Sequence, residues 1–444
     1  MKPTFRPKPL QILAGGYLLI TIIGTILLSL PAATADGSRQ PILDAWFLAT
    51  SAVSTSGLTV VDISRYYSPF GQIIIMAIFQ IGGLGYMSFF VFMLSLLKKN
   101  LTISRRVVAI ESVSGAGELS LSRFFKAVIL TTFSFESIGA LIFYLSWHSE
   151  LEPARAAYLS VFHSVSAFCT AGFSLFSDSL VSFQENLPIN LTISLLSLFG
   201  GVGFIVLIDL QGFLSKAIAK KRPRRLSPHT RLVLAAMASI MAVSFVTIIL
   251  VEPFRGLRVG DKILAALFQA ISASTTDGFN TVDIGALAPS ALLVLIFLML
   301  IGAGPGSTAG GFKISTFGTL VLAVWSFLHG KKDVNFQGRR IPDETISKAF
   351  FILFIFLGVA AFDAVILANT EEASFLQLIF EISSALGNTG LSMGITSSLT
   401  PVGRILITLT MFLGRVGPLT LGLSLLGRKS DGDYHYAKAA IYVG

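Results

Sequence analysis

The sequence predicts an all-α integral membrane protein in which four tandem units surround one pore. Of its 444 residues, 53% are hydrophobic and only 13% are charged, a composition that excludes a soluble domain. A short polar segment centred on a glycine occurs four times, and the glycines are 115, 106 and 112 residues apart. Each copy lies between two long apolar stretches. A repeat of this length indicates four equivalent structural units.

The repeated segment has fixed positions around its glycine. Ser-Ala stands six and five residues before the glycine in every copy, and a phenylalanine stands ten residues before it. The glycines are Gly57, Gly172, Gly278 and Gly390, and the phenylalanines are Phe47, Phe162, Phe268 and Phe380. We place the units at residues 1–98, 99–216, 217–329 and 330–444.

Each unit is predicted to contain a spanning helix, a pore loop and a second spanning helix. The first apolar spans cover about residues 10–30, 127–147, 232–251 and 350–367, close to the roughly 20 residues that a membrane helix needs. The second long spans begin near Pro69, Pro188, Pro289 and Pro401. The segment before each glycine, such as residues 44–53, has about ten residues and reaches only ~15 Å as a helix. We therefore expect eight spanning helices and four re-entrant half-helices, arranged pseudo-four-fold around the pore.

The loops after the half-helices predict a cation filter. Irregular backbone at membrane depth is tolerated only where protein shields it or where it lines a watery path. Four such loops around one axis can present carbonyl groups to a cation, and glycine lets the backbone adopt the required positive φ. Close helix packing is the alternative role for the small residues, but four equivalent copies favour the filter. The predicted filter residues are Thr55, Ser56, Gly57, Thr170, Ala171, Gly172, Thr276, Asp277, Gly278, Asn388, Thr389 and Gly390.

With these loops, the chain resembles the Trk/Ktr/HKT superfamily of potassium transporters over essentially its whole length, and most closely the Ktr-type membrane subunits. The four-fold repeat and the run GAGPGSTAGGFK carry the resemblance. It implies potassium uptake, with K⁺ held at Gly57, Gly172, Gly278 and Gly390, and leaves sodium coupling open. It also implies a homodimer and a KtrA-like ring of cytoplasmic nucleotide-binding subunits. We expect that ring to dock on the basic linkers 98–126 and 216–231 and on the tail that ends at Gly444.

The second span of the third unit is interrupted. Five glycines and a proline within ten residues halt the helix in mid-membrane, which is tolerable only against a water-filled cavity. In the resembled family this stretch is an intramembrane gate below the filter. The gate residues that we predict are Gly302, Ala303, Gly304, Pro305, Gly306, Ser307, Thr308, Ala309, Gly310, Gly311, Lys313 and Arg415.

Arg415 interrupts a glycine pattern that other second spans share. Gly82-Gly83-Leu84-Gly85 and Gly200-Gly201-Val202-Gly203 are predicted to pack helices closely, whereas the fourth unit has Gly414-Arg415-Val416-Gly417. An arginine inside a span faces protein or an aqueous path, so we expect Arg415 to act at the gate, by its charge or by holding helices together. Lys313 either adds to that charge or lies near the cytoplasm. Glu136, Asp209 and Asp363 are expected to be paired interior or interfacial residues, whereas Asp277, beside the third glycine, is expected to draw cations toward the filter mouth.

The distribution of charge predicts the orientation in a cell membrane. The termini and the linkers between units contain 24 of the 33 Lys and Arg residues, so both termini are expected to be cytoplasmic. The apolar run at 10–30 follows three basic residues as in a secretory signal, but its 21 residues exceed a signal's apolar core and we expect a membrane helix. The basic run 220–225 is expected to set topology beside anionic lipid rather than to bind nucleic acid.

Other functions are less compatible with the sequence. The single cysteine, Cys169, excludes an intrachain disulfide. The five histidines are scattered along the sequence and form no cluster typical of a catalytic or metal site. We therefore expect neither an enzyme nor an organic cofactor in this chain. A sodium or sodium/potassium symporter of the HKT type would share the fold, but that class has serine in place of the first filter glycine. A secondary carrier of an organic solute also uses broken helices, though usually in two repeats rather than four.

Overall fold

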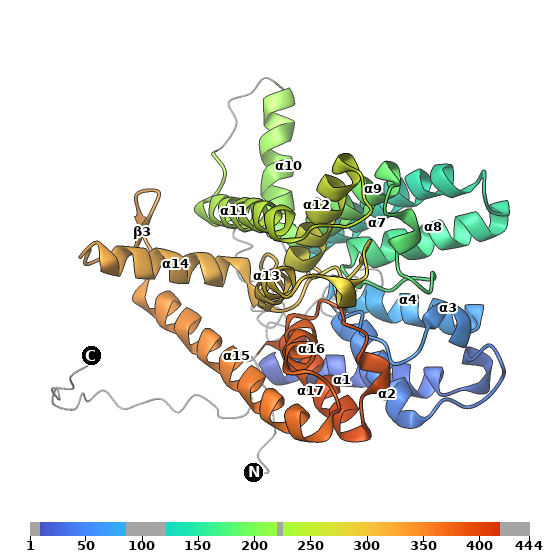
Figure 1. Cartoon of the computed structure of the whole chain (residues 1–444). Helices are drawn as coiled ribbons and strands as arrows, with labels where there is room; N and C mark the ends of the chain where they lie inside the picture. Colours follow the sequence, from blue (N-terminus) through green and yellow to red (C-terminus); the bar gives the residue numbers. More distant parts are fainter. Residues whose placement is uncertain (1–8, 86–120, 220–224, 418–444) are drawn as a thin grey trace, which may run out of the picture.

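The computed structural model describes residues 9–85, 121–219 and 225–417, and these form an almost entirely helical protein. Figure 1 shows the colours of the chain following one another around the centre of the molecule, from blue through green and yellow to red. The first unit contains α1 (Pro9–Leu28), α2 (Ile42–Ser54), α3 (Ile63–Tyr66) and α4 (Pro69–Leu84). The second contains α7 (Leu121–Trp147), α8 (Pro153–Phe168), α9 (Leu187–Val202) and α10 (Phe204–Ile218).

The third and fourth units repeat this order with short additions. The third contains α11 (Pro228–Val251), α12 (Val259–Thr275), α13 (Pro289–Leu300), β1 (Ile301–Gly302), β2 (Phe312–Lys313) and α14 (Ile314–Leu328). A hairpin of β3 (Asn335–Phe336) and β4 (Arg339–Arg340) leads to α15 (Asp343–Thr370), α16 (Phe375–Gly387) and α17 (Pro401–Val416). Short 3₁₀ turns lie in the links at Pro31–Ala33, Val181–Phe183, Ile284–Ala286 and Thr396–Ser398.

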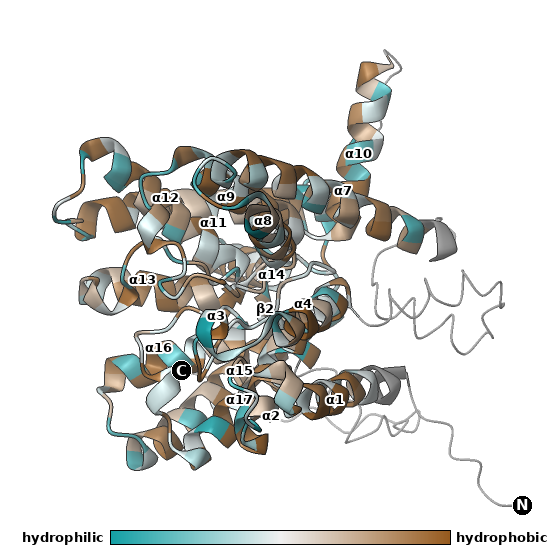
Figure 2. Ribbon diagram, turned by 90° about the vertical axis from the view of Figure 1, so that its right-hand side faces the viewer, coloured by the Kyte–Doolittle hydropathy of each residue, from teal (hydrophilic) through white to brown (hydrophobic). Residues whose placement is uncertain are grey.

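The first helices of the units are suited to a lipid environment. Among the described residues, α7, α11 and α15 are each long and apolar enough to cross a membrane, and the bent pair α9–α10 makes a fourth candidate. Large apolar side chains on their outer faces are exposed, for example Leu130, Val243 and Phe354. Hydrophobic residues also cover long stretches of α1 and α4 in Figure 2. This is the surface expected of a membrane protein, whose exterior contacts lipid chains rather than water.

The half-helices are longer than the sequence predicts. They contain 13 residues in α2, 16 in α8, 17 in α12 and 13 in α16, so the expectation of about ten residues is wrong. At 1.5 Å per residue they reach about 20 to 26 Å, still less than a ~30 Å hydrocarbon layer. An early helix start is favoured by Pro153 in the first turn of α8 and by the capping side chain of Ser374 before α16.

The second helices are shorter than the long spans that the sequence predicts. Three of them, α4, α9 and α17, have 16 residues and end at a glycine with positive φ: Gly85 at 73°, Gly203 at 99° and Gly417 at 84°. A right-handed helix cannot continue through such a residue. After Gly203 the chain turns by 101° into α10, which projects from the body in Figure 1. The last glycine of each motif is therefore a helix break.

The earlier glycines of these motifs do pack helices, as the sequence predicts. A Cβ atom added to Gly82, Gly200 or Gly414 would overlap a backbone carbonyl oxygen of the half-helix in the same unit. That carbonyl belongs to the residue four positions before the repeated glycine in each case, namely Val53, Phe168 and Leu386. The second helix can approach the half-helix this closely only because it has no side chain there.

Buried side chains pack the fourth unit against the first, so the four units form a closed ring. The four repeated phenylalanines are all fully buried, at 0% or 1% exposure. Apolar residues of the first and fourth units, including Phe47 and Met411, form one cluster although they lie far apart in the sequence. Beside that cluster, Arg404 of α17 pairs with Asp44 of α2 at 2.5 Å, with both side chains largely shielded. The last unit is thereby joined to the first.

Candidate pore site

Four glycine loops, residues 55–57, 170–172, 276–278 and 388–390, follow the half-helices with one repeated backbone geometry. In each, the residue two before the glycine has a positive φ: 55° at Thr55, 48° at Thr170, 55° at Thr276 and 53° at Asn388. The backbone amide of this residue donates to the carbonyl of the repeated Ala, and the amide of the following residue donates to the carbonyl of the repeated Ser. In the first unit, Thr55 N donates to Ala52 O and Ser56 N donates to Ser51 O. This is a Schellman-type end, and it turns the chain sharply after the helix.

Left-handed backbone at threonine costs energy, because a β-branched side chain crowds the backbone there. The cost recurs in three units, and asparagine takes the position in the fourth. Strain kept at equivalent places points to a geometry that function requires rather than to a chance turn.

The four glycines surround one axis and contact each other in the order of the units. A Cβ atom on Gly57 would lie 2.7 Å from the carbonyl oxygen of Ala171, and one on Gly172 would lie 2.5 Å from that of Asp277. A Cβ on Gly278 would overlap the carbonyl of Thr389, and one on Gly390 would overlap that of Ser56, which closes the cycle. Each glycine thus faces a carbonyl of the next unit. A side chain at any of the four glycines would therefore meet the backbone of the neighbouring loop.

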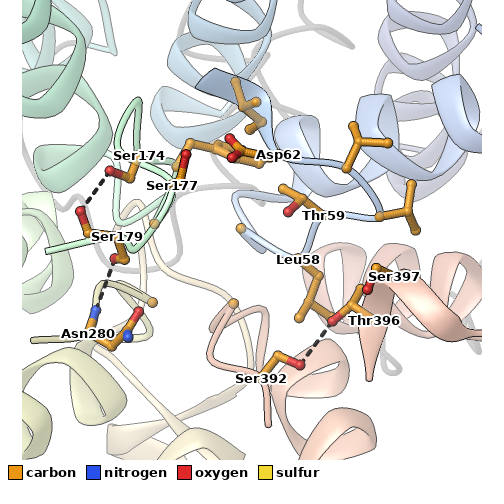
Figure 3. A pocket seen from close by; sticks show the side chains of 18 of the residues that line it. Leu58, Thr59, Asp62, Ser174, Ser177, Ser179, Asn280, Ser392, Thr396 and Ser397 are labelled. Carbon is orange, nitrogen blue, oxygen red and sulfur yellow. Dashed lines mark hydrogen bonds between the residues drawn. The ribbon is translucent and has the colours of Figure 1, made fainter. Parts of the chain in front are cut away.

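The glycines open on one side into a cavity of 430 Å³ that all four units line. Its wall includes the residue two positions after each glycine: Thr59, Ser174, Asn280 and Ser392. Figure 3 shows these polar side chains around the opening, with Asp62 and Ser177 at its edge. Asp277, expected to draw cations to the mouth, is fully buried and does not line this cavity.

The 302–311 loop lies against the glycine loops through residues that do not line this cavity. Strands β1 and β2 pair in parallel, Ile301 with Phe312 and Gly302 with Lys313, and hold the two ends of the loop together. Thr308 lies under the glycine loops: its carbonyl oxygen accepts from Thr55 Oγ1 at 3.1 Å, and its hydroxyl lies 3.2 Å from that of Thr170. The same hydroxyl donates to Phe168 O at 3.1 Å. One loop residue therefore contacts two glycine loops.

Comparisons with known proteins identify the family. The family model described as TrkH, cation transport protein, matches residues 11–428. The chain belongs to this family of cation transport proteins. It is 36% identical to the Ktr system potassium uptake protein B of Bacillus subtilis, over 99% of this chain and 97% of that protein. It is 31% identical to the potassium/sodium uptake protein NtpJ of Enterococcus hirae, over 99% and 98% respectively.

The solved structures agree on the fold. The crystal structure of the potassium transporter TrkH from Vibrio parahaemolyticus superposes with a TM-score of 0.72 at 22% identity, covering 96% of this chain and 86% of that one. The protein is thus a multi-pass membrane transporter of this cation transport family and not an enzyme. The expectation of a family resemblance is confirmed.

Arg415 joins the 302–311 loop to two other units of this transporter. Its Nη1 donates to the carbonyl of Thr308 and its Nη2 to that of Gly82, at the end of α4. A planar guanidinium suits this task because its fork of donors can reach two carbonyls at once. The arginine predicted from the interrupted glycine motif is therefore a clamp between the loop, α4 and α17.

Lys313 stabilises the loop from within. Its Nζ donates to Ala309 O at 2.7 Å and to Gly310 O at 3.0 Å, so it caps carbonyls that no helix satisfies. The three acidic residues expected to be paired are each hydrogen-bonded to polar groups of the protein. Gln80 donates to Glu136, Thr410 to Asp363, and Ser227 and Thr230 to Asp209.

Sequence reasoning missed two features of the site. It placed Thr308 in the loop but did not indicate that this residue contacts the glycine loops, because the contact joins segments 253 residues apart. It also passed over the residue after each repeated phenylalanine, which is His163, Gln269 or Glu381 in three units. Alignment of the four copies at that position was the signal that could have found them.

Proposed function

We propose that this protein takes up potassium through one pore, with the four glycine loops as its selectivity filter. The observation that carries the proposal is the closed cycle in which each glycine faces a carbonyl of the next unit. Backbone carbonyls in such a ring replace the hydration shell of a cation, and the half-helices point their negative carboxyl ends toward it. Homologues named for potassium uptake at about 35% identity support the choice of ion.

A sodium/potassium transporter is the second candidate, because one relative over nearly the full length is named for both ions. Glycine rather than serine at position 57 favours potassium. The family assignment gives no support to a carrier of organic solutes. Uptake of radioactive rubidium by an uptake-deficient host, with competition by potassium and by sodium, separates the two candidates. Repeating it with and without sodium tests sodium dependence.

Replacing Gly57 with serine is expected to weaken the preference for potassium over sodium, about tenfold if one coordinating position is disturbed. The new side chain would stand 2.7 Å from the carbonyl of Ala171, at a residue with a φ of 82°. The measurement is the ratio of potassium and sodium concentrations that half-inhibit rubidium uptake. An unchanged ratio in folded Gly57→Ser protein would contradict the filter assignment.

We also propose that the 302–311 loop is a gate and that Arg415 holds it closed. The support is the position of Thr308 directly against Thr55 and Thr170, three residues that do not line the cavity. Glycine-rich backbone can move with little strain, whereas the Arg415 and Lys313 hydrogen bonds favour the closed position. A cation arriving from the filter would also meet the fixed positive charge of Arg415.

The orientation and the assembly remain proposals. We infer eight spanning helices and cytoplasmic termini from the apolar spans and the distribution of charge. We infer a homodimer and a regulatory ring of nucleotide-binding subunits from the family resemblance, and the relatives named as protein B of a Ktr system support further components. Most of the expected docking surface, residues 98–120, 220–224 and the tail to Gly444, lies outside the described residues. Native mass spectrometry of the purified protein with and without such a regulator tests this, and a strict monomer that binds none would contradict it.

The outer cavity has an acidic residue suited to attract cations. Partial burial of Asp62 favours its neutral form, but hydrogen bonds from Ser177 and Ser64 and the charge of Arg65 lower the pKa of this carboxyl below its usual value. Asp62 is therefore ionised at any physiological pH, at the edge of the cavity in Figure 3.

Changing Asp62 to asparagine is expected to raise the KM for potassium about two- to fivefold at low ionic strength, with little effect at high salt. Asparagine still caps α3, so folding should be retained. Rubidium uptake at two salt concentrations measures the effect. Asp36→Asn is the control, because Asp36 also has a lowered pKa but does not line the cavity. Equal changes in both variants would contradict a local role of Asp62.

A further inference from the structure

One position behind the glycine loops is polar in three units and apolar in the fourth. It stands nine residues before each repeated glycine, and we call it the anchor position: Leu48, His163, Gln269 and Glu381. All four side chains are at most 1% exposed. A buried histidine or glutamate is costly unless hydrogen bonds satisfy it, so their partners show what these residues do.

In the second unit, His163 bonds to the chain just beyond the glycine. Its Nδ1 lies 2.8 Å from the carbonyl oxygen of Leu159, so Nδ1 carries a proton and donates. The other ring nitrogen, Nε2, is then an acceptor. It accepts from the backbone amide of Leu175 at 3.3 Å and lies 3.1 Å from the hydroxyl of Ser174. These residues follow Gly172 by three and two positions.

In the fourth unit, Glu381 makes the equivalent bonds with a carboxylate. Ser392 Oγ donates to its Oε2 at 2.7 Å, and Thr396 Oγ1 donates to its Oε1. The two hydroxyl oxygens lie 3.0 Å apart, the contact drawn between Ser392 and Thr396 in Figure 3. Both belong to the segment after Gly390, and both line the outer cavity. Gln269 of the third unit makes a weaker contact, 3.4 Å from its Nε2 to Thr281 Oγ1.

The first unit holds the same segment in another way. Leu48 cannot form a hydrogen bond, and the chain after Gly57 instead packs Leu58 and Val60 into the apolar cluster that contains Ile382 and Ile395. Every glycine loop is therefore fixed at its start by the Schellman-type end. Beyond the glycine it is fixed by a polar anchor or by apolar packing.

We propose that Glu381 and His163 are positioning residues that set the preference for potassium over sodium, each fixing its glycine loop from behind. Selection between two ions of equal charge depends on where a few carbonyl oxygens are held and how easily they move. A segment released beyond the glycine lets its carbonyls close around the smaller ion. The proposal rests on the filter assignment made above.

The test compares ion preference with capacity for transport. Glu381→Leu copies the residue of the first unit and removes both hydrogen bonds. It is expected to reduce the potassium-to-sodium preference about tenfold. Maximal rubidium uptake per folded transporter is expected to stay within about threefold of wild type, because the pore itself is intact. Glu381→Gln keeps one acceptor oxygen and should give an intermediate preference, and His163→Leu should lower it in the same direction.

Controls separate positioning from general damage. Leu48→Met changes the anchor position of the first unit while keeping its volume, and it should leave the preference unchanged. If Glu381→Leu does not fold, Ser392→Ala and Thr396→Val remove the donors from the other side. A lowered preference for potassium over sodium in those variants supports the proposal. A wild-type preference overturns it, whether it is found in those variants or in folded Glu381→Leu.

Failure of the filter assignment has a different result. If Gly57→Ser keeps the wild-type preference, the glycine loops are not the filter, whatever Glu381 does. If Gly57→Ser loses preference while Glu381→Leu and His163→Leu keep it, the filter stands and only the positioning role is wrong.

Discussion

Gly278→Ala is expected to reduce potassium uptake on the order of 100-fold or more while the protein still assembles in the membrane. The added methyl group would overlap the carbonyl oxygen of Thr389 and crowd the Cα of Gly390 at 3.3 Å. It would also stand at a φ of 86°, where alanine is strained. Because the four glycines are in contact around one axis, this single atom moves two adjacent loops and narrows the path. Rubidium uptake per folded transporter, with folding judged by the size-exclusion profile, measures the effect.

Gly394→Ala is the matched control for that experiment. Gly394 has nearly the same φ, 89°, and also follows a glycine loop, but a Cβ atom there would meet nothing within 4 Å. It therefore carries the backbone strain without the contact, and we expect a cost of about 1 kcal/mol in stability with near-normal uptake. If Gly278→Ala transports as well as Gly394→Ala does, the glycine cycle does not line the pore.

Opening the 302–311 loop is expected to have the opposite effect. Deleting residues 305–307 shortens the loop between β1 and β2, so Thr308 can no longer reach Thr55 and Thr170. We expect roughly a tenfold rise in flux per folded transporter and weaker dependence on a regulatory subunit. Arg415→Ala removes the clamp on Thr308 but leaves the loop, so a smaller rise of about three- to tenfold is expected from the lost charged hydrogen bonds.

Two further arginine variants show how Arg415 acts. Arg415→Lys keeps the positive charge but cannot bridge the carbonyls of Thr308 and Gly82, so its flux should lie between those of wild type and Arg415→Ala. Arg404→Ala removes another arginine of α17, which pairs with Asp44 away from the loop, and should lower the yield of folded protein without raising flux. Normal folding with unchanged or lower flux in both the loop deletion and Arg415→Ala would end the gate proposal.

Much of the fold could be predicted because the repeat is visible as fixed spacings between residues that are close in the sequence. The positions of Phe47 and Gly57 and their three counterparts fixed the number of units, the half-helices and the glycines of the site. The lengths were less predictable. The breaks at Gly85, Gly203 and Gly417 depend on positive φ, and the same motif contains glycines that pack in helical conformation. Nothing in the composition of the motif separates the two roles.

The sequence by itself determined which residues repeat and that they end half-length helices, because periodicity and spacing are properties of neighbours along the chain. Only the tertiary structure decided which carbonyl each glycine faces and which units the loop touches. Arg415 meets Thr308 across 107 residues and Gly82 across 333, and Asp277 turns out to be buried rather than at the mouth. Contacts of that separation arise when whole helices pack around a common axis, so no local pattern of residues encodes them.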